Sequence, residues 1–121
     1  MSKGIYNQAY FDNHPEECDV EATLYCVVLV NKQTYEREAI KIGITKGKGW
    51  KAALSRSSGF TFHDIRIQKT VSGRLEDIYW LEDYMHETWQ HKRKEMPQKF
   101  GGHTECFEVC DEIIKSIPDK P

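Results

Sequence analysis

Long apolar runs are absent from the sequence. The longest purely aliphatic run, Val27–Val30, is far shorter than the roughly 20 residues that a membrane-spanning helix needs. The N-terminus also lacks a basic stretch followed by an apolar one, which is the pattern of an export signal. The sequence therefore predicts an intracellular, cytoplasmic protein without a membrane partner.

No Cys-x-x-Cys pair occurs among the four cysteines, Cys18, Cys26, Cys106 and Cys110. Without an export signal, free thiols are the expected state rather than disulfides. Zinc is an alternative, because His103, Cys106 and Cys110 have usable ligand spacing. Cys26, however, lies in an apolar stretch, where cysteine usually acts as a small hydrophobic residue.

An overall basic charge is also absent: the formal net charge is −2 and the pI is near 6.2. This argues against nonspecific coating of nucleic acid, which favours basic domains. The charge is unevenly distributed, however. One stretch has basic side chains and no acidic ones: Lys41, Lys46, Lys48, Lys51 and Arg56. This stretch predicts a surface that contacts DNA phosphates, although a solvated, lysine-rich loop would have the same composition.

The length of 121 residues, with 39% hydrophobic residues, suits one compact domain. We expect an irregular lead-in over residues 1–21, a domain over residues 22–117 and a short tail over residues 118–121. The order of the patterned segments predicts an α/β (α+β) fold.

Two strands are expected first, over Ala22–Val30 and Glu38–Thr45, and they form an antiparallel hairpin. In the second strand the isoleucines alternate with other residues, so they face the core, while Lys41 and Gly43 share the opposite face. A short helix over about 49–56 comes next, followed by a strand over Phe60–Val71 with Ile65, Ile67 and Val71 on one side. A long helix is expected from about Gly73 to Lys94, with Ser72 as its N-cap. The chain then forms a strand over Thr104–Val109 and a helix over Asp111–Ile117.

A carboxylate stands in the apolar stripe of the long helix. Four apolar residues lie within about 60° of Glu82 around the helix axis, namely Leu75, Ile78, Met85 and Trp89. Desolvating a carboxylate is costly unless a partner or a metal compensates, so metal binding is a natural role for Glu82. His86 lies on the same side of the helix and is a candidate for the same site. The alternatives are a salt bridge from Glu82 to a buried basic residue, and a His86 that only packs.

The order of these features resembles the GIY-YIG nuclease domain, in a variant of phage and homing-type proteins that has lysine at the second tyrosine position. The segments that carry the resemblance are Leu24-Tyr25-Cys26, Lys41-Ile42-Gly43-Ile44-Thr45, Leu81-Glu82 with His86, and Phe100-Gly101-Gly102-His103-Thr104-Glu105-Cys106-Phe107. The string Gly4-Ile5-Tyr6 also spells the first motif, but it lies in no strand-like run.

The resemblance implies a small, mainly antiparallel three-stranded sheet flanked by helices. It also implies a metal-dependent endonuclease that hydrolyses DNA phosphodiester bonds. Glu82 would hold the Mg²⁺ (or Mn²⁺) and Tyr25 would act on the attacking water. Lys41, Lys51, Arg56 and His86 complete the candidate catalytic set. Lys46 and Lys48, together with Lys51 and Arg56, are the candidate DNA-binding residues.

The sequence departs from the family pattern at one position. Members usually carry an arginine eight or nine residues after the glycine of the second motif, and that count from Gly43 reaches Lys51 or Ala52. Lysine lacks the planar, two-pronged contact of arginine with phosphate, so either Arg56 is recruited or the site is weakened. The alternative function is therefore a module that binds nucleic acid or a protein partner without cleavage.

Overall fold

The computed structural model describes residues 7–47, 63–95 and 106–121. The expected helix over residues 49–56 lies outside these ranges. The same holds for five residues or segments singled out above: Gly4-Ile5-Tyr6, Lys48, Lys51, Arg56 and Phe100–Glu105. Within the described part of the chain, no helix is both long and apolar enough to cross a membrane.

The core of the fold is an antiparallel sheet in the order β3-β1-β2-β4. The strands are β1 (Glu21–Asn31), β2 (Arg37–Lys46), β3 (His63–Arg74) and β4 (Cys106–Phe107). With its helices this is the expected α+β fold. The sheet has a fourth strand because the chain returns to β2 and pairs Phe107 with Ile40 and Cys106 with Lys41.

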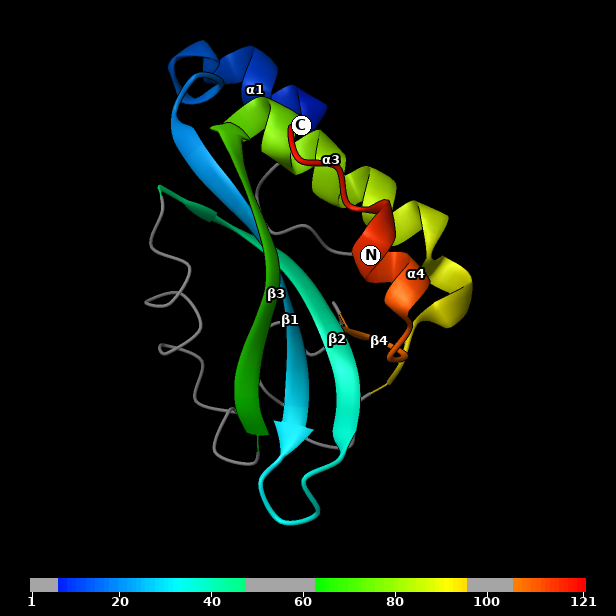
Figure 1. The fold of residues 1–121 in the computed structure, drawn as a ribbon. Helices are drawn as coiled ribbons and strands as arrows, with labels where there is room; N and C mark the ends of the chain where they lie inside the picture. The colour runs from blue at the N-terminus through cyan, green and yellow to red at the C-terminus, as the bar shows by residue number, and fades with distance from the viewer. Residues whose placement is uncertain (1–6, 48–62, 96–105) are drawn as a thin grey trace.

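The helices of the described chain lie against the sheet, as Figure 1 shows. The long helix α3 follows β3 directly, α1 lies near its N-terminal end and α4 near its C-terminal end. Their bounds are α1 (Gln8–Asn13), the 3-10 turn η1 (Pro15–Glu17), α3 (Leu75–Thr88), the 3-10 turn η3 (Gln90–Lys92) and α4 (Asp111–Ser116).

The expectation of an irregular segment before β1 is wrong over residues 8–17. The Asn7 side chain accepts a hydrogen bond from the Tyr10 amide at 2.8 Å and so caps α1. Phe11 is buried in the core, and its ring meets the Tyr79 ring edge-on at 5.5 Å. A single buried aromatic therefore anchors a helix whose remaining residues are mostly polar.

The start and end of the long helix also differ from the prediction. Ser72 is not an N-cap but a strand residue, and its hydroxyl lies 3.1 Å from that of Thr23 on β1. Arg74 is the N-cap and makes no side-chain capping bond. At the other end α3 stops at Thr88, and Trp89 is its C-cap. Pairing of β3 with β1 therefore prevails over the capping preference of serine.

The two faces of the sheet carry different apolar clusters. The first cluster includes Leu24, Cys26, Ile40 and Ile42 of the sheet and packs against α1, α3 and α4. The second cluster, on the opposite face, is made by Tyr25, Val27, Leu29, Ala39 and Cys106. This alternation confirms that Ile40 and Ile42 face the helices while Tyr25 belongs to the other side.

The expected alternation along β3 is wrong because the strand contains a bulge. The register shifts where Cys26 pairs with Lys69 and Val27 pairs with Ile67. Because one extra residue is inserted, alternate side chains that point to one face of the sheet before the bulge point to the opposite face after it. Val71 is therefore buried beneath the helices, whereas Ile65 packs on the second cluster and Ile67 is 42% exposed.

Candidate functional site

Tyr25 and Gly43 face each other across the β1–β2 hairpin. Tyr25 is 5% exposed, and its ring lies over the glycine. A Cβ atom at Gly43 would approach the Tyr25 hydroxyl oxygen to 2.5 Å and the Lys41 Nζ to 3.0 Å. The glycine of the Lys-Ile-Gly motif thus leaves room for the tyrosine hydroxyl and the lysine ammonium.

Lys41 completes this group from the same face of the sheet. Its ammonium donates a hydrogen bond to the Tyr25 hydroxyl oxygen at 2.7 Å and lies 4.7 Å from the centre of the tyrosine ring. The side chain is only 3% exposed. Burying an ammonium costs several kcal/mol. This cost is a large share of the free energy of unfolding of a small domain. Such a group needs compensation, and the tyrosine supplies part of it.

Glu82 lies in the middle of the buried face of α3, as the sequence predicts. It is 2% exposed, and Ile78 and Met85 on either side of it belong to the apolar cluster beneath the helices. Its proximity also contributes to raising the pKa of Tyr79, after burial and the charge of Asp83. Glu82 is therefore a carboxylate in a largely apolar setting.

His86 fixes α3 to the sheet. Its Nε2 lies 3.0 Å from the carbonyl oxygen of Ile42, and because a carbonyl only accepts, Nε2 must carry the proton. The ring also meets the Phe107 ring edge-on at 5.1 Å. This contact gives His86 an anchoring role. A catalytic role for His86 remains a prediction, and it would have to use the other ring nitrogen.

Through the His86 contact, the turn of α3 that carries Glu82 lies against the part of β2 that contains Lys41 and Gly43. Ile42, whose carbonyl is bonded, lies between Lys41 and Gly43 in β2. Tyr25 and Lys41 leave the sheet on the face opposite to Ile42, whereas α3 packs on the Ile42 side. The sheet therefore separates Glu82 from the tyrosine–lysine pair, and the structure does not bring these three side chains together in one site.

Of the expected DNA-binding residues, Lys46 falls in the described ranges. Its Nζ lies 3.0 and 3.1 Å from the two carboxylate oxygens of Glu17. Both side chains are partly exposed, and exposed ion pairs contribute roughly 0–1 kcal/mol. A phosphate could therefore replace Glu17 at little cost, so phosphate binding by Lys46 stays a prediction.

The cysteines do not assemble a zinc site within the described ranges. Cys26 and Cys106 belong to apolar clusters on opposite faces of the sheet, so they cannot share one ion. Burial raises the pKa of the Cys26 thiol to about 12, which keeps it protonated. In the part of the chain that the structure describes, no three His, Cys, Asp or Glu side chains gather as metal ligands.

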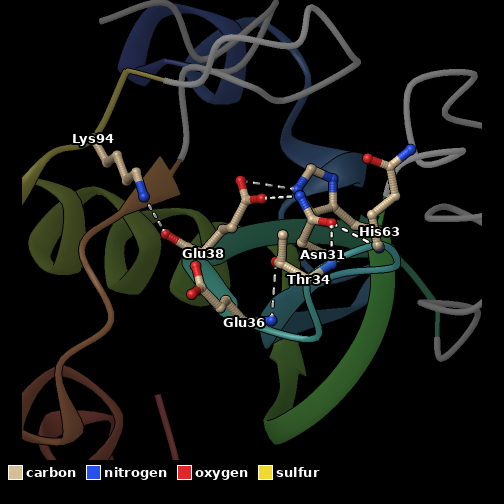
Figure 2. Close-up of polar contacts among 7 residues, drawn as sticks. Asn31, Thr34, Glu36, Glu38, His63 and Lys94 are labelled. Carbon is tan, nitrogen blue, oxygen red and sulfur yellow. Dashed lines mark hydrogen bonds and ion pairs between the residues drawn. The ribbon is translucent and has the colours of Figure 1, made fainter.

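A second polar cluster, which the sequence analysis missed, closes the far end of the hairpin (Figure 2). The Glu38 carboxylate accepts a hydrogen bond from the Asn31 amide and lies 3.3 Å from His63 Nε2. Lys94 donates to the Glu38 backbone carbonyl. The hydrogen bond from Asn31 and then that from His63 lower the pKa of Glu38, against the effect of burial.

No pattern in the sequence indicates this second cluster, because its members come from three separate segments. The Asn31 side chain also accepts hydrogen bonds from the amides of Gln33 and Thr34, at 2.7 and 3.0 Å. This is a common way for asparagine to close a turn. The cluster therefore holds the β1–β2 turn in shape and ties Lys94 to it.

Residues 23–120 match the T5orf172 domain, a phage-associated domain related to nuclease-type modules. No curated protein and no solved structure matches the chain. The match spans both motif strands, β3, α3 and α4. The chain therefore belongs to the T5orf172 domain family.

Proposed function

We propose that the protein is a metal-dependent DNA endonuclease of the GIY-YIG type. The observation that carries the proposal is the buried hydrogen bond between Lys41 and Tyr25 over Gly43. Membership in a family related to nuclease-type modules supports it. A purely structural hairpin would favour an apolar residue at position 41, because a buried ammonium costs several kcal/mol.

The hydrogen bond sets what the tyrosine can do. A phenol hydroxyl has one proton and can accept as well as donate. Because the Tyr25 oxygen accepts from Lys41, its proton is directed to a different acceptor. In the proposed reaction that acceptor is the attacking water or a phosphate oxygen. Lys41 contributes a cation near the charge that develops on the phosphate, where a preorganised positive group lowers the barrier.

Glu82 is the residue that the family resemblance assigns to the metal ion. It lies on the face of the sheet opposite to Tyr25 and Lys41, so its role is proposed separately from that of the pair. A single buried carboxylate fits Mg²⁺, which keeps several water ligands and is often bound through one or two carboxylates and substrate phosphates. When bound, the ion would stabilise charge on the phosphate and lower the pKa of a bound water. His86 holds the turn of α3 that carries this carboxylate through its bond to the Ile42 carbonyl.

DNA is the proposed partner, and its proposed contact residues are Lys46, Lys48, Lys51 and Arg56. Basic side chains bind phosphates whatever the base sequence, so binding should weaken as salt rises. We further propose that the protein acts inside the cell, in the host cytoplasm where phage DNA is processed.

The test is relaxation of a supercoiled plasmid in Mg²⁺ or Mn²⁺, with EDTA as the metal-free condition. Wild type and Glu82→Gln are compared, since glutamine keeps the size of the side chain and removes its charge. Nicking that requires the metal and is lost in Glu82→Gln would support the proposal. Retained DNA binding with no cleavage by wild type would overturn it in favour of a module that only binds.

A further inference from the structure

The outward face of α3 carries two exposed aromatic side chains with no place in either apolar cluster. Trp80 is 40% exposed and Tyr84 is 63% exposed. They are four residues apart, so they are neighbours on the helix surface. At about 100° per residue, each lies about 160° around the helix from Glu82, the centre of the buried face. The pair therefore occupies the middle of the outer face.

The surroundings of the pair are acidic. From Leu75 to Thr88 the helix has several carboxylates and no lysine or arginine. Those nearest the outer face include Asp77, whose side chain is 45% exposed, and the exposed Glu87. Asp77 lies 3.4 Å from Arg74, an exposed ion pair of small energy. The outer face of α3 is thus aromatic and negatively charged.

The orientation of Trp80 is partly fixed. Its ring meets that of Tyr79 edge-on, with the ring centres 4.9 Å apart. Tyr79 is itself 5% exposed and in contact with Phe11 in the core. The exposed indole therefore rests on a buried ring, which lowers the entropy lost when a partner binds.

We propose that this face of α3, defined by Asp77, Trp80, Tyr84 and Glu87, binds a lysine- and arginine-rich segment of a protein partner. The negative charge of the helix repels a phosphate backbone and attracts cations. Aromatic faces hold ammonium and guanidinium groups, most strongly over tryptophan. Exposed tryptophan and tyrosine are also the residues that most often dominate the energy of protein interfaces.

Figure 1 shows α3 as an outer element of the described fold, on one side of the sheet. Lys41 and Tyr25 leave the sheet on the other side. The proposed protein surface and the tyrosine–lysine pair are thus separated by the sheet, so one partner can be bound at α3 without covering that pair. This inference does not depend on whether the protein cleaves DNA.

The test uses a fluorescently labelled peptide of eight arginines as the probe, with an eight-glutamate peptide as the charge control. Anisotropy measures binding to wild type, to Trp80→Ala/Tyr84→Ala and to Tyr35→Ala. Tyr35 is the matched control, because it is 80% exposed and lies between β1 and β2. Figure 1 shows the β1–β2 turn at the end of the hairpin that lies away from α3. We expect the double variant to lose about tenfold in affinity and Tyr35→Ala to bind like wild type.

A second double variant tests the contribution of charge, and the aromatic variant also tests the alternative occupants. Asp77→Asn/Glu87→Gln should also weaken binding of the arginine peptide, with an unchanged melting temperature. Equal binding by wild type and the aromatic double variant, or no binding by wild type, would overturn the proposal. It would also be overturned by self-association that requires Trp80 and Tyr84, or by DNA binding that requires them, since the occupant would then be a second copy or a nucleic acid.

Discussion

Lys41 donates a hydrogen bond to the hydroxyl oxygen of Tyr25 at 2.7 Å, and the two side chains are 3% and 5% exposed. The bond joins two neighbouring strands on the face of the sheet that α3 does not cover. Burying the Lys41 ammonium costs more free energy than burying an apolar side chain at the same position. This cost is the physical reason for treating the pair as functional.

Replacing Lys41 with methionine should separate these two contributions. Methionine keeps the length of the side chain and removes the charge, so stability should be unchanged or higher by about 1–3 kcal/mol. Plasmid cleavage should fall by at least about tenfold, because a cation beside the reacting phosphate is lost. Urea denaturation and plasmid nicking measure the two effects. A variant that is much less stable but fully active would show that Lys41 is structural.

Gly43→Ala should displace the tyrosine. The added Cβ would lie 2.5 Å from the Tyr25 hydroxyl oxygen, so the ring or the strand must move. We expect stability to fall by about 1–3 kcal/mol and cleavage by at least about tenfold.

Gly47→Ala is the control for this substitution. Gly47 has a φ of +71° with no atom within 4 Å of an added Cβ. Alanine there should cost about 1 kcal/mol through the backbone alone and leave cleavage per folded molecule unchanged. If both alanine variants lost cleavage equally, the effect at Gly43 would reflect stability rather than the position of Tyr25.

His86→Ala should destabilise the fold through its contact with the sheet. Removing the imidazole leaves the Ile42 carbonyl without the His86 donor, at a cost of about 1–3 kcal/mol. His86→Gln should recover part of this, since its amide nitrogen can donate. Thermal and urea unfolding give the comparison, with the exposed His91→Ala as a control. An alanine variant as stable as wild type would remove the anchoring role assigned to His86.

Glu38 should make the stability of the hairpin depend on pH. The hydrogen bond from Asn31, followed by that from His63, holds the pKa of Glu38 below its ordinary value of 4.5, and Lys94 adds a smaller effect in the same direction. A lowered folded-state pKa contributes stability above the ordinary value, and this contribution is lost as pH falls through the folded value.

The comparison for Glu38 is the melting temperature of wild type and Glu38→Gln between pH 7 and pH 3. The advantage of wild type should be constant at neutral pH and shrink below about pH 4.5. A difference that stayed the same down to pH 3 would show that the charge of Glu38 contributes nothing.

Much of this architecture is readable from local sequence patterns. Alternation in β2 places Ile40 and Ile42 on one face and Lys41 and Gly43 on the other, and the structure confirms this division. The stripe of α3 likewise predicts that Glu82 is buried. These features follow from the periods of strands and helices, which depend only on neighbouring residues.

The features that sequence patterns did not predict depend on contacts between distant segments. Ser72 has the side chain of a helix cap, but its pairing with Thr23 keeps it in β3. The bulge near Lys69 reverses the expected orientation of Ile65, and no local signal marks it. The Asn31–Glu38–His63 cluster was missed for the same reason, since β3 brings the histidine to the hairpin.

The most direct test of the proposed activity is the rate of plasmid nicking by Tyr25→Phe compared with Tyr79→Phe. Both tyrosines are 5% exposed, but Tyr25 accepts the bond from Lys41, whereas Tyr79 is a residue of α3 that packs in the cluster between the helices and the sheet. We predict that Tyr25→Phe loses at least about a hundredfold in rate, with intact folding and DNA binding, while Tyr79→Phe cleaves like wild type. Equal cleavage by Tyr25→Phe and wild type would contradict the assignment of this tyrosine to the reacting centre.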